Sequence, residues 1–232
     1  MTLEKNIEHV VERVKNAAIT SNRNPEEIQL IAVTKTVDID VIKKAMDYGI
    51  THVGENKVQE LIRKYDEIGP AVKWHLIGHL QRNKVKYIID KVDLIHSLDS
   101  YKLAEEINSR AKEVSRTMEC LLQVNVSGEE TKYGVTPDAA KEIVIKISAL
   151  TNIKIMGLMT MAPYVNNQEE ARKFFKGLKN LSKEISEMRI ENVEMKYLSM
   201  GMSNDFEVAI EEGANLVRVG SLIFGERDYS NK

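Results

Sequence analysis

Eight short apolar runs alternate with amphipathic stretches, and this alternation constrains the fold more than any other feature of the sequence. The runs that we predict as strands are 29–34, 51–54, 74–78, 93–97, 119–125, 155–159, 195–199 and 215–219. Stretches with helical spacing of apolar residues follow the first seven strands. Five of them span 38–48, 55–65, 100–115, 168–188 and 204–212, and two begin at residues 81 and 137. Apolar strands separated by helices are typical of a parallel sheet, because each crossover must return the chain to the same edge.

Eight such units predict an α/β fold, a single (β/α)8 or TIM barrel. An open doubly wound sheet is the alternative, but it usually contains fewer strands. Little sequence remains after residue 219 for an eighth outer helix, whereas residues 7–18 have the spacing of an extra N-terminal helix. We expect this helix to cover the gap. No linker or change of composition divides the 232 residues, which predicts one domain over 1–232.

Composition argues against several functional classes. The 33 basic residues nearly balance 35 acidic ones, so the net charge of -2 gives no electrostatic case for nucleic acid or an anionic membrane. One cysteine excludes an intrachain disulfide, and no cluster of cysteine and histidine indicates structural zinc. No apolar run approaches the roughly 20 residues of a membrane span, and Glu4, Glu8 and Glu12 argue against a targeting peptide. We therefore expect a soluble protein of the reducing cytoplasm.

Lys35 follows the first predicted strand directly, at the edge of a barrel where active residues lie. Burial lowers the pKa of a lysine amine and makes it nucleophilic, as a Schiff base with a carbonyl compound requires. From position alone, a surface lysine that extends its amine into water is the more frequent interpretation.

Glycine and hydroxyl residues occur together after the seventh and the eighth strands. Gly201 allows close approach of the backbone, and Ser203 is predicted to cap the next helix and to contact an anion. Gly220 and Ser221 repeat the combination after the eighth strand. Because barrels commonly bind phosphate with these two loops, we predict a phosphate site, with ordinary turn and capping chemistry as the alternative.

Six stretches resemble the pyridoxal-phosphate homeostasis proteins (the YggS/PROSC family), which look like the barrel domain of alanine racemase standing alone. The stretches are Ala32-Val-Thr-Lys-Thr36, Gly54-Glu-Asn56, His75-Leu-Ile-Gly-His-Leu-Gln-Arg-Asn-Lys84, Gly157-Leu-Met-Thr-Met-Ala-Pro163, Leu198-Ser-Met-Gly-Met-Ser-Asn-Asp205 and Arg218-Val-Gly-Ser-Leu-Ile-Phe-Gly225. The resemblance implies pyridoxal 5′-phosphate (PLP) as the cofactor, held by Lys35 as an internal aldimine. It also implies that the cofactor phosphate lies near Ser203, Gly220 and Ser221, and that Asn56 lies beside the ring.

The same resemblance implies that Arg218 faces the pyridine nitrogen. Because arginine stays protonated, it disfavours a protonated ring nitrogen and makes the ring a weaker electron sink. We expect no bound metal, since His75 and His79 lack the glutamate of a zinc-protease helix and favour structural or mouth-lining roles.

Two main functions are compatible with such a site. One is a non-catalytic, monomeric carrier for intracellular PLP homeostasis, which holds the cofactor and delivers it to apo-enzymes. The other is an amino-acid racemase of the alanine racemase type, which needs a second acid or base that alanine racemase takes from another domain and a partner subunit. Neither Tyr133 nor Tyr164 has a motif reason to supply that group, so we expect the carrier. A plain phosphosugar-binding barrel is a third possibility.

Lys132 lies between Gly128 and Gly134, after the fifth strand. Glycines at both ends favour a flap over the barrel mouth. We therefore hypothesise that Lys132 acts as a second amine or a phosphate contact during cofactor release. The alternative is a solvated lysine that balances Glu129 and Glu130.

Overall fold

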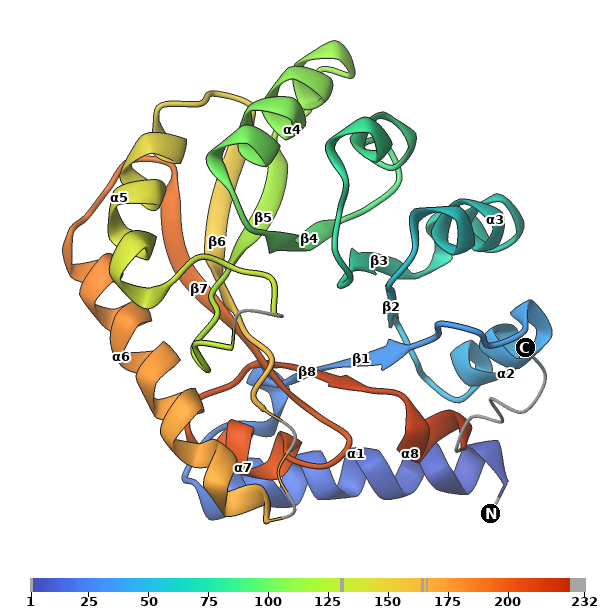
Figure 1. Cartoon of the computed structure of the whole chain (residues 1–232). Helices are drawn as coiled ribbons and strands as arrows, with labels where there is room; N and C mark the ends of the chain where they lie inside the picture. The colour runs from blue at the N-terminus through green and yellow to red at the C-terminus, as the bar shows by residue number, and fades with distance from the viewer. Residues whose placement is uncertain (1, 130–131, 164, 166, 226–232) are drawn as a thin grey trace.

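The computed structural model describes residues 2–129, 132–163, 165 and 167–225, and within these ranges eight parallel strands form a closed barrel (Figure 1). Each strand pairs with the next, and the eighth pairs with the first, which confirms the (β/α)8 prediction. The strands are β1 (Gln29–Val33), β2 (His52–Glu55), β3 (Lys73–Leu76), β4 (Leu94–Leu98), β5 (Met118–Gln123), β6 (Ile153–Met159), β7 (Val193–Met202) and β8 (Leu216–Val219).

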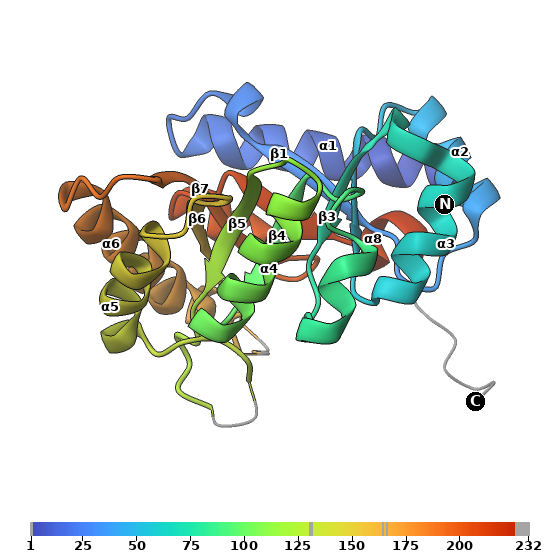
Figure 2. The same cartoon turned by 90° about the horizontal axis from the view of Figure 1, so that it is seen from above.

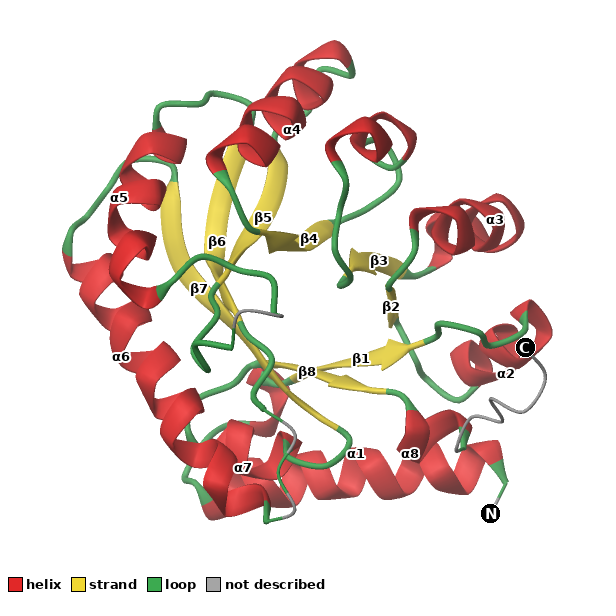
Figure 3. Cartoon of the chain, in the orientation of Figure 1, coloured by secondary structure: helices red, strands yellow, loops and turns green. Residues whose placement is uncertain are grey.

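Helices surround the barrel on its outer side (Figure 3). The α-helices are α1 (Leu3–Thr20), α2 (Ile39–Asp47), α3 (Val58–Ile68), α4 (Tyr101–Glu113), α5 (Pro137–Ser148), α6 (Arg172–Glu187), α7 (Phe206–Glu211) and α8 (Ser221–Phe224). Short 3-10 segments are η1 (Pro25–Glu27), η2 (Gly69–Ala71), η3 (Arg82–Tyr87) and η4 (Gln168–Ala171).

The helix expected from residue 81 is the clearest difference from the sequence prediction, because this segment forms the 3-10 helix η3. Val85 and Ile88 are both fully buried there. In a 3-10 helix, residues three apart lie directly above each other. This winding places Val85 on the core side, and Ile88 follows it into the core at the C-cap of η3.

The N-terminal helix packs where the eighth outer helix is short, as predicted. α1 lies against α7 and α8, on the opposite side of the barrel from α4 (Figures 1 and 2). Arg13 forms an ion pair with Glu207 on α7 at 2.8 Å, and the Asn6 amide donates to the carbonyl of Ile223 on α8 at 3.0 Å. None of the helices in the described ranges is long and apolar enough to cross a membrane.

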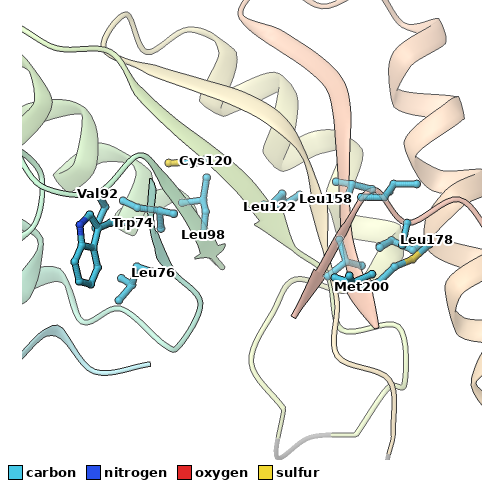
Figure 4. Packing of buried hydrophobic residues seen from close by; sticks show 14 of the residues in the cluster. Trp74, Leu76, Val92, Leu98, Cys120, Leu122, Leu158, Leu178 and Met200 are labelled. Atoms are coloured by element: carbon cyan, nitrogen blue, oxygen red, sulfur yellow. The ribbon is translucent and has the colours of Figure 1, made fainter. Parts of the chain in front are cut away.

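The core has two layers separated by the strands. Side chains such as Trp74, Leu98 and Leu178 fill the space between strands and helices (Figure 4). Inside the barrel, a smaller apolar cluster consists of Ile31, Leu94, Leu121, Met156, Met159 and Leu216. The interior also contains buried polar side chains, which bear on function.

Candidate functional site

A cavity of about 700 Å³ opens at the carboxyl ends of the strands. The residues singled out from the sequence all line it: Lys35, Asn56, Lys132, Ser203, Arg218, Gly220 and Ser221. Ile77, Met161 and Met202 give the same cavity an apolar wall. Its size is in the range of small-molecule sites, and it combines three cationic side chains with hydroxyl groups.

The backbone on both sides of Lys35 is fixed by a buried ionic cluster. Lys64 on α3 donates to the carbonyl oxygen of Thr34 at 2.7 Å, and the Thr36 N–H donates to Glu60 Oε2 at 2.8 Å. Thr36 has a φ of 63°, which is unusual for a β-branched residue. These contacts hold Lys35 at the end of β1 in a conformation that the local sequence alone does not favour.

Lys64 itself is an unusual lysine, because its side chain is fully buried. Its amine lies 2.7 Å from Glu55 Oε1 and 3.3 Å from Glu60 Oε2. Burial acts to raise the pKa of Glu60, but the N–H of Thr36 and the charge of Lys64 outweigh it and lower that pKa. A buried ammonium group is tolerated only when carboxylates and hydrogen bonds compensate it.

Arg218 extends from β8 into the cavity and is 4% exposed. Its Nη1 donates to Ser199 Oγ at 2.5 Å, and its Nη2 donates to the carbonyl oxygen of Thr160 at 2.8 Å. Burial lowers the Arg218 pKa to about 10, against an opposing effect of Asp205. The guanidinium is therefore still protonated at neutral pH and brings a fixed positive charge to the cavity.

Ser203 and Gly220 bring together the loops after β7 and β8, since the Gly220 N–H donates to Ser203 Oγ at 3.4 Å. The prediction that Ser203 caps the next helix is wrong. Asp205 occupies the N-cap position of α7, and its carboxylate accepts from the Met202 N–H at 2.6 Å. The turn at 203–205 delays the helix by two residues, which leaves the Ser203 hydroxyl on the cavity wall.

Asn56 presents a buried side-chain oxygen, Oδ1, that lacks a hydrogen-bond partner among the described residues. Its backbone also lies against Gly78, where an added β-carbon would come within 2.3 Å of the Asn56 carbonyl oxygen. A glycine is needed at this position for the close approach. Since a buried polar atom without a partner is costly, Asn56 is suited to contact a ligand.

Lys132 lies on the cavity wall, and its amine forms an ion pair with Glu129 Oε1 at 3.0 Å. This amine has no hydrogen-bond partner among the described residues. Its neighbours Glu130 and Thr131 are outside the described residues, as is Tyr164. Tyr133 stacks on His79 with ring centroids 4.0 Å apart, and His79 also pairs with Asp99. Within the described part of the chain, no group of acidic, cysteine and histidine side chains could hold a metal ion.

Four residues of this region were not found from the sequence, namely Lys64, His52, His96 and Ser199. The histidines form hydrogen bonds inside the barrel, where His75 joins them. The sequence did contain a signal for the inward direction of two histidines, because His75 and His96 occupy the third positions of β3 and β4. Alternation along each strand points both side chains inward.

These features define a (β/α)8 barrel protein with a cationic, amine-containing cavity at its mouth. The family model described as "Alanine racemase, N-terminal domain" matches residues 4–228. The chain is 46% identical to the pyridoxal phosphate homeostasis protein of Aquifex aeolicus, over 96% of this chain and 97% of that protein. Its identity to the Escherichia coli K12 protein of the same name is 36%, over 98% and 97% of the two chains. The chain therefore belongs to the family of pyridoxal phosphate homeostasis proteins.

Solved structures agree with this assignment. A structure described as that of an unknown protein from Bifidobacterium adolescentis superposes with a TM-score of 0.92 at 36% identity, covering 96% of this chain and 94% of that one. PipY of Synechococcus elongatus PCC7942, in a structure with PLP bound, gives 0.81 at 34% identity, covering 93% and 100%. An alanine racemase from Clostridium difficile 630 gives 0.72 at 15% identity, covering 99% of this chain and 58% of that one, and it shows the shared fold.

Proposed function

We propose that the protein binds PLP in the mouth cavity and serves as a non-catalytic carrier in intracellular PLP homeostasis. The observation that carries this proposal is the convergence of Lys35, Arg218 and the Ser203–Gly220 contact on one cavity. The structure of the relative PipY with PLP bound supports it.

The residues of the cavity fit the cofactor on physical grounds. PLP supplies an aldehyde, which a primary amine converts to a Schiff base with loss of water, and a phosphate group. Lys35 is the amine held at a strand end, and Arg218 supplies a buried positive charge. Asn56 Oδ1 is a buried acceptor that a polar ligand group can satisfy.

Ser203, Ser221 and the Gly220 N–H are our candidates for the phosphate. They come from two loops that a hydrogen bond joins, so the donors are already close together before a ligand binds. Ser203→Ala and Ser221→Ala should each weaken PLP binding by about 1.5–3 kcal/mol, because each removes a charge-assisted hydrogen bond. Isothermal titration of both variants with PLP and with pyridoxal tests this placement. Equal affinity of the unmodified protein for the two compounds would exclude it.

The carrier is favoured over a racemase by two observations. Tyr133 stacks on His79 and is absent from the described residues that line the cavity. The relatives matched over nearly their whole length are also named for homeostasis. A racemase would interconvert the enantiomers of alanine when loaded with PLP, which a chiral amino-acid assay detects.

Several finer points belong to the same proposal. We infer a monomer that acts in the cytoplasm and delivers PLP to apo-enzymes, with Lys132 assisting release. Lys132 shares the cavity with Lys35, which supports a role as second amine or phosphate contact, while its ion pair with Glu129 supports the alternative of a structural lysine. Transfer from loaded Lys132→Ala to an apo-enzyme distinguishes them. Unchanged transfer rate and retention would remove Lys132 from the release step.

The proposed function is tested most simply by absorbance. Lys35→Ala, mixed with PLP and dialysed, should lack the visible band of the protein-bound Schiff base. Lys183→Ala is the matched control, because Lys183 is a 76% exposed lysine on α6, far in sequence from the cavity residues. A band of normal intensity in Lys35→Ala would contradict the assignment.

A further inference from the structure

A chain of hydrogen bonds runs through the barrel interior and ends at Arg218. His52 Nδ1 lies 2.9 Å from His75 Nε2, and His75 Nδ1 lies 2.9 Å from His96 Nε2. His96 Nδ1 lies 2.9 Å from Ser199 Oγ, which also accepts from Arg218. The five residues come from β2, β3, β4, β7 and β8, so the chain crosses the barrel from one wall to the other.

The two ends of this chain lie in different cavities. Arg218 lines the mouth cavity, whereas His52 and His75 line a second cavity of about 440 Å³. The second cavity is bordered by Gln29, Lys73 and Leu94, which are the first residues of β1, β3 and β4. It therefore opens at the amino ends of the strands, and the hydrogen bonds connect opposite ends of the barrel.

The donors and acceptors give the chain a direction. Arginine can only donate, so Ser199 Oγ accepts from Arg218. The hydroxyl hydrogen of Ser199 then has His96 Nδ1 as its acceptor among the described contacts. With Ser199 as the donor, His96 and His75 each carry their hydrogen on Nε2, and each donates to the next ring. This arrangement uses every polar atom along the path.

Such a chain is unusual in a barrel, whose interior is normally filled with branched apolar side chains. His75 is 3% exposed, and His96 and Ser199 are fully buried. Burial lowers the His75 pKa to about 3 and holds the His96 pKa well below its ordinary value. Both rings are thus neutral near pH 7, and neutral imidazoles have two tautomers that can reverse the direction of the chain.

His52 is the end of the chain that can titrate, because its side chain is only half-buried. Burial lowers its pKa, Asp93 opposes that effect, and Lys73 adds to it. The other charged or titratable groups that face the same cavity are Arg116, Glu119 and Tyr197, and the neighbouring ring is His75.

We propose that His52, His75, His96 and Ser199 form a directional relay that positions Arg218 and couples the proton occupancy of His52 to it. In the protonated state His52 carries hydrogens on both nitrogens and donates to His75 Nε2. Its Nδ1 hydrogen comes from His75 Nε2, His75 Nδ1 receives the hydrogen of His96 Nε2, and His96 Nδ1 receives the hydroxyl hydrogen of Ser199. Ser199 regains one proton from water at the mouth cavity. His75 and His96 then carry their hydrogens on Nδ1, and His96 donates to Ser199 Oγ. One proton is gained overall, and His75 and His96 each keep a single hydrogen.

The consequence for the mouth cavity follows from Ser199. While Ser199 donates to His96, its oxygen is a stronger acceptor for Arg218, because linked hydrogen bonds polarise one another. After reversal the oxygen accepts from two donors, so the bond to Arg218 weakens. Protonation at one end of the barrel therefore loosens the arginine at the other. This effect on PLP rests on the proposed function, whereas the relay itself can be observed without the cofactor.

Nitrogen-15 NMR of histidine in the cofactor-free protein tests the relay directly. Above the His52 pKa, His75 and His96 should be neutral with hydrogen on Nε2, and His9 and His79 serve as internal references outside the chain. Through the His52 titration, both rings should change to the Nδ1 tautomer in the same step. Nδ1 tautomers at high pH would overturn the direction, and tautomers that stay constant through the titration would overturn the coupling.

Two variants that leave His75 and His96 in place provide a second test. Ser199→Ala should speed solvent exchange of the Arg218 Nη hydrogens about tenfold or more, the equivalent of one hydrogen bond to a charged group, and Ser199→Thr should restore it. His52→Gln should abolish the pH-linked change at Arg218, while His9→Gln leaves it intact. Arg218 exchange that is the same in Ser199→Ala as in the unmodified protein contradicts the proposal. Loss of PLP binding with the NMR results intact would instead count against the proposed function alone.

Discussion

Replacement of the buried Lys64 by methionine is the substitution whose effect the structure specifies best. Lys64 and Glu55 both have fully buried side chains, and their charged atoms are 2.7 Å apart. Methionine keeps most of the side-chain length but leaves Glu55 as a buried carboxylate without its cation. Breaking a buried pair in this way costs about 3–5 kcal/mol. For a chain of this size the melting temperature should fall by roughly 6–20 °C.

Urea unfolding near neutral pH measures this loss, with an unchanged m-value as evidence that the same surface is exposed. Glu55→Gln in the Lys64→Met background removes the buried charge and should recover about half of the lost free energy. Lys146→Met is the matched control, because Lys146 and Glu142 form an exposed pair with 56% and 71% exposure. That pair should contribute less than about 1 kcal/mol. An equally small effect of Lys64→Met would refute the buried-cluster account.

Two further predictions concern stability. Burial lowers the His75 pKa to about 3 from about 6.5 in an unfolded chain, so the unfolded state binds the extra proton between these values. The stability that neutral His75 provides is complete above about pH 6.5, and below it the free energy of unfolding falls by about 1.4 kcal/mol per pH unit. Urea midpoints that stay constant from about pH 7 to about pH 5 would contradict this pH dependence. Gly157→Ala should destabilise by more than about 1 kcal/mol, because φ is 148° and an added β-carbon would lie 1.9 Å from the Tyr197 carbonyl oxygen. Gly177→Ala, where nothing lies within 4 Å, is its control in a thermal melt.

The sequence was sufficient to predict the barrel and the residues of its mouth, because apolar runs mark the strands and the polar residues after them must meet at one edge. Lys35 and Ser203 were found in this way, Arg218 was implied by the family resemblance, and all three line one cavity. The cap assigned to Ser203 was wrong, since a turn of two residues intervenes before α7.

The polar interior could not be predicted from strand positions alone. Lys64 lies on a helix with ordinary amphipathic spacing, and only the packing of α3 against β2 in the folded barrel brings its amine to Thr34. The histidines are different, because alternation in β3 and β4 already points His75 and His96 inward. Their connection to Ser199 depends on which strands face each other across the closed barrel, and that follows from closure rather than from local sequence.

Mass spectrometry after borohydride reduction tests the central claim most directly. The protein is loaded with PLP, the Schiff base is reduced to a stable secondary amine, and the modified peptide is located after digestion. We expect one pyridoxyl phosphate group, on Lys35. Modification of another lysine, with Lys35 unmodified, would contradict the account of the site.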